Sequence, residues 1–122
     1  MKYTVVDALS RLRPGAEWIV RGDVYSGIEW LDSGQTKPTE TEINNKISEL
    51  DAAEPMRLLR EERFRLLSEC DWTQGSDVPD SIKTAWQTYR QQLRDLPASA
   101  SPSLDSNGNL DLTSVTWPTE PS

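Results

Sequence analysis

The spacing of large apolar residues between positions 82 and 96 constrains the fold more than any other feature. They recur at intervals of four, three, four and three, as Ile82, Trp86, Tyr89, Leu93 and Leu96. This spacing places all five on one side of an α-helix and makes a narrow seam of the coiled-coil type. Pro97 follows directly and is expected to end the helix. We interpret Trp86 and Tyr89 as core residues, because they lie inside the regular seam.

A second helix is expected before this one, from Met56 to about Cys70. Its apolar residues fall within one wide arc at about 100° per residue; they are Met56, Leu59, Phe64, Leu66, Leu67 and Cys70. The residues between the helices, 71–80, include glycine and proline and indicate a loop. Two helices joined by a short loop pair antiparallel, so residues 55–97 predict a helical hairpin.

The remaining C-terminal residues, 98–122, predict a flexible linker and a docking tail. Residues 98–109 are rich in serine, alanine, proline and asparagine and have no apolar period. A strip with alternating apolar residues follows, and a tethered strip of this kind suits partner binding. The alternative is that the strip folds back on its own helical hairpin. The candidate partner-binding residues are those of the strip and one loop tryptophan: Leu110, Leu112, Val115, Trp117, Pro118 and Trp72.

The N-terminal residues, 1–54, predict a small α+β module. A short helix over 4–12 is followed by two strand-like runs, which form a β-hairpin with turn residues between them. Thr39 and Glu42 have the spacing of a capping box and open a further helix. That helix is expected to stop or kink sharply at Pro55, which lacks an N–H donor. The whole chain is therefore expected to be α+β, with its module boundary at residues 54–55.

Arg21-Gly22-Asp23 spells a tripeptide known from integrin ligands. A match of three residues arises often by chance, and Gly-Asp is a favourable turn sequence. We interpret the tripeptide as the turn of the hairpin.

Composition argues against several classes of function. The net charge is −7, and an acidic chain without a basic patch is a poor ligand for nucleic acid. The sequence has no histidine and one cysteine, so common zinc sites, histidine-based triads and internal disulfides are not expected. No apolar run approaches a membrane span, and no signal peptide is evident. Catalysis by paired carboxylates would need clustered acids, whereas these lie on charged helix faces beside arginines. We expect no catalytic, cofactor or metal site. We expect a soluble intracellular protein, or a part of a particle that is assembled inside a cell.

The run LLREERFRLLSECDWTQGSDVPDSIKTAWQTYRQQLRDLPA, followed by VTWPTEP, resembles the tail assembly chaperones of tailed bacteriophages, and more specifically the tail fibre assembly proteins. The matching positions are Arg60, Arg63, Leu66, Leu67, Asp71, Trp72, Thr73, Trp86, Tyr89, Arg90, Leu93, Arg94, Trp117 and Pro118. The N-terminal half, with PGAEWIVRGDVYSGIEWLD and KPTETEI, resembles a second phage module, the XkdW-like domain.

The resemblance implies a non-enzymatic chaperone that binds a phage tail fibre protein and assists its folding, trimerisation or attachment. The chain would act in the host cell cytoplasm during assembly, as a homo-oligomer or bound to the trimeric fibre, and some relatives stay on the virion tail. The alternative is a permanent structural subunit of the fibre or baseplate.

Overall fold

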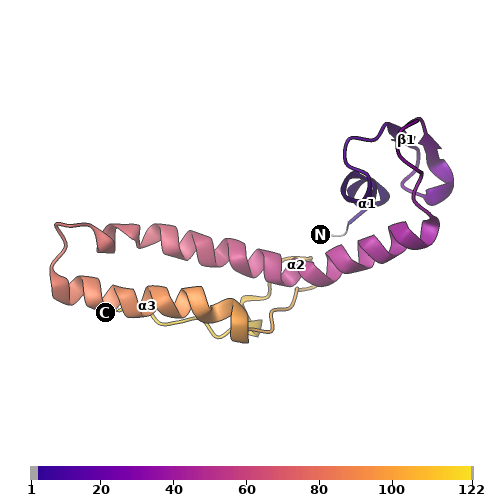
Figure 1. Cartoon of the computed structure of the whole chain (residues 1–122). Coiled ribbons are helices and arrows are strands. Elements are labelled where there is room, and N and C mark those ends of the chain that lie inside the picture. The colour runs from indigo at the N-terminus through magenta and orange to yellow at the C-terminus, as the bar shows by residue number, and fades with distance from the viewer. Residues whose placement is uncertain (1–2, 122) are drawn as a thin grey trace. The chain divides into compact units, whose positions relative to one another are not determined.

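The computed structural model describes residues 3–121. Within that range it contains three α-helices, short 3-10 turns and one two-stranded antiparallel sheet (Figure 1). The chain divides into two compact units, Met1–Glu54 and Pro55–Ser122, each with its own buried apolar residues. This content of helix and sheet confirms the α+β class.

Helix α1 (Val5–Leu12) begins at a capping box that the sequence analysis did not identify. The N–H of Thr4 donates to the Asp7 carboxylate at 2.9 Å, and the N–H of Asp7 donates to the Thr4 hydroxyl at 3.4 Å. Two N–H groups that a helix start would leave unpaired are therefore satisfied. The expected helix over 4–12 is confirmed.

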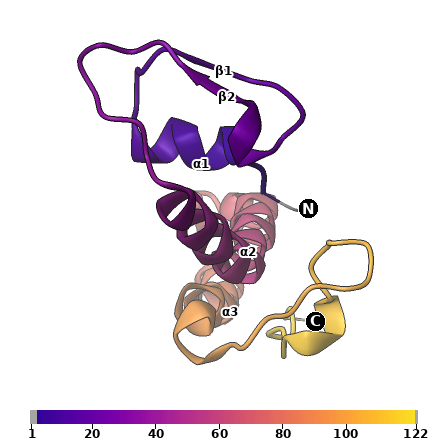
Figure 2. The same ribbon diagram turned by 90° about the vertical axis from the view of Figure 1, so that its right-hand side faces the viewer.

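Strands β1 (Trp18–Val20) and β2 (Ile28–Trp30) form the expected hairpin (Figure 2). Trp18 lies opposite Trp30 in the register. The connection contains the 3-10 turn η1 (Tyr25–Gly27). Gly22 and Asp23 have φ angles of 77° and 49°, which glycine and aspartate tolerate better than other residues. The turn interpretation of the tripeptide is thus confirmed.

One buried cluster joins the elements of the first unit. Side chains from α1, β2 and the start of α2 contribute to it: Val5, Ala8, Leu9, Ile28 and Ile43. Helix α2 (Glu40–Glu69) begins at the predicted capping box. The N–H of Thr39 donates to Glu42 and the N–H of Glu42 to the Thr39 hydroxyl, both at 3.1 Å.

Of the stop or sharp kink expected at Pro55, the stop is wrong, because α2 continues through this residue to Glu69. Proline inside a helix costs about 3 kcal/mol, since it lacks the N–H and crowds the preceding turn. Contacts on both sides of Pro55 hold the helix. Glu54 is 1% exposed and accepts a hydrogen bond of 2.7 Å from the Tyr3 hydroxyl, while Leu59 is fully buried in the second unit. The packing of the flanking turns decides the structure here.

The second unit is built on an antiparallel pair, the C-terminal half of α2 and helix α3 (Asp80–Ser99) (Figure 1). Hydrogen bonds cross between the helices: Arg63 donates to the carbonyl of Arg94 at 3.1 Å, and Arg90 donates to that of Leu67 at 2.9 Å. The partners move toward the N-terminus of α3 as they move toward the C-terminus of α2. The helical hairpin inferred from the sequence is therefore observed.

Two details of the hairpin differ from expectation. Helix α3 passes Pro97 and ends at Ser99, where the N–H of Ala100 donates to the carbonyl of Leu96 at 3.0 Å. Leu96 is buried, and its packing holds the last turn. Phe64, predicted to face the core, is 71% exposed. It lies at one edge of the apolar arc, beyond the width that a single partner helix covers.

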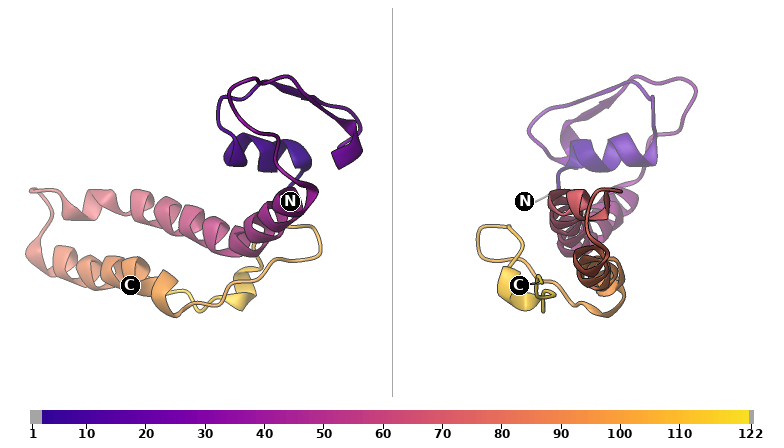
Figure 3. Two further views of the ribbon diagram at one scale, coloured as in Figure 1. Left: turned by 45° about the vertical axis from the view of Figure 1, so that its right-hand side comes forward. Right: turned by 90° about the vertical axis from the view of Figure 1, so that its left-hand side faces the viewer.

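The C-terminal strip lies beside the helical hairpin, and the loop before it projects from the helices (Figure 3). Leu110, Val115 and Trp117 pack in the cluster with Leu59 and Leu96. The segment expected to be a flexible linker contains a closed turn, in which Leu104 bridges to Leu110 and the N–H of Asp105 donates to the carbonyl of Asn109 at 2.7 Å. The strip after it contributes Val115, 7% exposed, to a cluster with Leu59 and Leu96. Of the two alternatives left open for the strip, the structure has the one that folds back.

Candidate protein-binding surfaces

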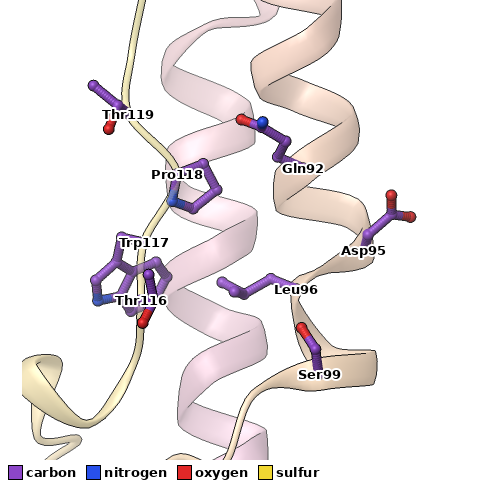
Figure 4. A pocket seen from close by; sticks show the side chains of 8 residues that line it. All are labelled: Gln92, Asp95, Leu96, Ser99, Thr116, Trp117, Pro118 and Thr119. Atoms are coloured by element: carbon purple, nitrogen blue, oxygen red, sulfur yellow. The ribbon is translucent and has the colours of Figure 1, made fainter.

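A groove runs between α3 and the C-terminal strip (Figure 4). It has a volume of about 540 Å³ and is open to solvent. Four residues of α3 form one wall and four consecutive strip residues form the other; they are Gln92, Asp95, Leu96, Ser99, Thr116, Trp117, Pro118 and Thr119. Asp95 and Leu96 are each three or four residues from both Gln92 and Ser99, so the four lie on one side of the helix. We call this the tail groove.

Local hydrogen bonds hold the wall that the strip contributes. The carboxylate of Asp111 accepts from the N–H of Thr113 at 3.0 Å and caps the 3-10 turn η3 (Leu112–Ser114). The Trp117 indole N–H donates to the carbonyl of Leu112 at 3.1 Å. Trp117 also packs on the cluster around Leu59, so its ring is held at both its polar and its apolar side.

The backbone along the tail groove has unused hydrogen-bonding capacity. Within residues 3–121, the N–H groups of Thr116, Trp117, Thr119 and Glu120 donate no hydrogen bond. Pro118 and Pro121 have no N–H to offer. An irregular strip with unpaired backbone groups is able to pair with an extended segment of another chain, as in the addition of a β-strand.

A second surface lies at the closed end of the helical hairpin. Trp72, in the 3-10 turn η2 (Asp71–Gln74), is 62% exposed. Its ring lies 6.0 Å from that of Trp86, which in turn lies 5.5 Å from the Tyr89 ring in an edge-to-face arrangement. These aromatic contacts run from the exposed Trp72 to the buried Tyr89. We call Trp72 and Trp86 the aromatic tip.

The backbone under the aromatic tip is held from both helices. Thr73 is fully buried and its hydroxyl donates to the carbonyl of Cys70 at 2.6 Å. Arg90 of α3 pairs with Asp71 at 3.0 Å and also donates to the Cys70 sulfur at 3.2 Å. Trp72 is therefore an exposed side chain on a fixed turn, which lowers the entropy lost when it is bound.

Burial raises the pKa of the Tyr89 hydroxyl above its ordinary value, and the negative charge of Glu120 adds to the effect. Tyr89 and its neighbours Cys70 and Leu93 form a buried cluster, as expected for Tyr89 from the seam.

The six residues predicted to bind a partner occupy different environments. Leu112 and Trp72 are more than half exposed, and Trp117 and Pro118 are half-buried beside the tail groove. Leu110 is half-buried and Val115 is buried against the hairpin. Their binding role stays a prediction. The sequence analysis did not predict the groove wall formed by α3. The helical spacing of these α3 residues indicates a groove wall only when the position of the strip is known.

Features of other site classes are absent from the described part of the chain. Residues 3–121 contain no group of three or more cysteine, aspartate or glutamate side chains arranged to hold a metal ion. In the same range, no helix combines the length and apolar character needed to cross a membrane.

Comparison with known proteins gives one match. The family model described as phage tail assembly chaperone protein matches residues 56–122, more than half of the chain. No curated protein and no solved structure matches. The matched range holds the tail groove and the aromatic tip, whereas the resemblance of the N-terminal half to an XkdW-like domain stays a prediction.

Proposed function

The chain belongs to the phage tail assembly chaperone family, and on that premise we propose that it binds a tail fibre protein and assists its folding, trimerisation or attachment. The family itself indicates a non-enzymatic role in tail assembly with a phage tail protein as partner. The finer proposal concerns which tail protein is bound, and by which surface. In the host cell the chain would act before the fibre is complete.

The unpaired backbone beside the tail groove is the observation that carries the proposal. Fibre subunits expose apolar strand edges before they trimerise, and such edges aggregate unless they are covered. The strip offers N–H and carbonyl groups from Thr116 to Glu120, next to the apolar side chains of Leu96 and Trp117. An edge strand of the fibre that lies along the strip would pair its backbone N–H and carbonyl groups with those of the strip, and its side chains would enter the groove.

The aromatic tip supplies a second contact in the same proposal. Exposed tryptophans dominate the energetics of many interfaces, because they bury a large area at small entropic cost. Trp72 is presented on a fixed turn, and Leu112 adds an exposed apolar side chain on the C-terminal strip. A non-obligate complex is suitable for a chaperone, which must release its fibre.

The proposal is tested by affinity capture of the fibre protein encoded with this chain. Gln92→Trp fills the tail groove from an exposed helix position, and Gln87→Trp makes the same change on α3 outside the groove. We expect the first variant to lose capture and the second to retain it. A wild-type chain that captures no fibre protein contradicts the proposal, as does equal capture by both variants.

The aromatic tip is tested with Trp72→Ser, matched by Phe64→Ser, which removes an equally exposed aromatic from the same unit. Only the first is expected to weaken capture, by roughly fivefold or more for an interface tryptophan. Mass spectrometry of purified phage particles then separates a chaperone from a permanent subunit. One copy for each fibre in every particle would favour the structural role.

A further inference from the structure

The first unit contains a groove that the tail assembly family does not account for, because the family match begins at residue 56. The groove has a volume of about 420 Å³ and lies among α1, the turn of the hairpin and the start of α2. Its lining residues all belong to the first unit: Tyr3, Thr4, Val5, Asp23, Val24, Tyr25, Ser26, Glu40, Ile43, Asn44 and Ile47. We call it the N-terminal groove.

The walls of the N-terminal groove are held in place without a ligand. The N–H of Val5 donates to the Asp23 carboxylate at 3.0 Å, which fixes the hairpin turn over the first turn of α1. The Tyr25 hydroxyl donates to the carbonyl of Pro38 at 3.0 Å, on the segment that leads into α2. Ile43 is 1% exposed and forms part of the core below. The groove is therefore preformed.

The lining combines apolar and acidic side chains. Its apolar residues include Val5 and Ile43, which are buried, Ile47, which is half-buried, and Val24, which is 50% exposed. Asp23 and Glu40 are the charged residues of the lining, and among residues 3–121 neither makes an ion pair. Lys37 lies over the Tyr25 ring at 4.6 Å but does not line the groove. The groove thus presents apolar surface next to negative charge.

We propose that the N-terminal groove is a second binding site, which takes a peptide segment with an apolar side chain next to a lysine or arginine. The apolar side chain would lie on Val24 and Ile47, which keep exposed surface in the groove, and the cation would lie against Asp23 or Glu40. Ligand sites commonly combine an apolar floor with a few polar groups that set specificity. With the tail groove on the other unit, the chain would then bind two segments, and each bound segment would raise the effective concentration of the other.

The test uses the full chain and a defined probe, acetyl-KLKLK-amide, followed by ¹H–¹⁵N NMR. We expect saturable shifts at the amides of Val5, Val24 and Asn44. The acidic counterpart acetyl-ELELE-amide is expected to bind at least about tenfold more weakly, because like charges would meet at the groove edge. Added salt should weaken the cationic peptide only.

Two variants separate the groove from general attraction to an acidic protein. Val24→Lys places a cation in the groove at an exposed position and is expected to abolish the shifts. Ile19→Lys makes the same change at a similarly exposed residue, 42%, on strand β1 outside the groove, and is expected to retain them.

Three results would overturn the proposal: no saturable shift with the cationic peptide, equal binding of the acidic peptide, or unchanged shifts in Val24→Lys. A fourth is a change of the same amide signals on dilution without peptide, which would mean that a second copy of the chain occupies the groove. None of these outcomes bears on the capture of the fibre protein through the tail groove.

Discussion

Truncation of Val115 tests whether the C-terminal strip is part of the folded hairpin. Val115 is 7% exposed and packs with Leu59 and Leu96, from the two helices. Val115→Ala removes two methyl groups from this cluster. At about 0.8 kcal/mol for each buried group, with a further term for the cavity left behind, the free energy of unfolding should fall by about 2 kcal/mol. If the strip were tethered but not packed, Val115→Ala would leave the free energy of unfolding almost unchanged.

The assay is urea unfolding followed at the indole N–H signals of Trp86 and Trp117, which report the second unit alone. The expected shift in midpoint is on the order of 1 M. Leu112→Ala is the matched control, because it removes more atoms from the same strip at a residue that is 55% exposed. It should cost less than about 0.5 kcal/mol. Equal effects of the two truncations would refute the packing of the strip.

Two further predictions concern single interactions. The raised pKa of Tyr89, caused first by its burial, means that the folded state favours the neutral phenol; stability present below about pH 10 should be lost as pH rises through the folded-state pKa. Above about pH 10, the midpoint temperature of thermal unfolding should therefore fall more steeply with pH for the wild type than for Tyr89→Phe. Parallel plots of midpoint temperature against pH for the two proteins would contradict this. Thr39→Ala removes the cap of α2 and should cost about 1 kcal/mol in chemical denaturation of the first unit. The control Thr41→Ala, on the exposed first turn of the same helix, should be near neutral, and a loss as large as that of Thr39→Ala would argue against the cap.

Local rules predicted the parts of the chain whose signals lie within a few residues. The box of Thr39 and Glu42 and the turn at Gly22 and Asp23 each depend on neighbours in sequence. The seam ending at Leu96 predicted a buried helix face, because apolar residues spaced by four and three lie on one side of an α-helix. These features were therefore available without a structure.

The proline rule failed where distant contacts outweigh a local cost. Pro55 breaks one hydrogen bond in α2, yet Glu54 beside it is bonded to Tyr3, fifty-one residues earlier in sequence. Nothing near Pro55 in the sequence indicates that partner. Helix α3 continues through Pro97 for a similar reason, because Leu96 is buried against α2 and the strip.

In the candidate site, too, local sequence indicated some features, whereas others depend on residues distant in sequence. Trp72 was a candidate partner-binding residue from its place in the loop, and it is 62% exposed there; its binding role stays a prediction. The tail groove was not foreseen, because its walls come from α3 and from a strip more than fifteen residues further on. The packing of Val115 and Trp117 against Leu59 and Leu96 places the strip beside α3, and no signal within a few residues of the strip indicates these contacts.

We propose that the chain keeps a fibre protein soluble until the fibre trimerises. The direct measurement is the fraction of that fibre protein recovered as soluble trimer when it is co-expressed with the wild-type chain, with Gln92→Trp, or alone. We predict abundant trimer with the wild type and little in the other two cultures. Equal recovery of trimer in all three would contradict the account.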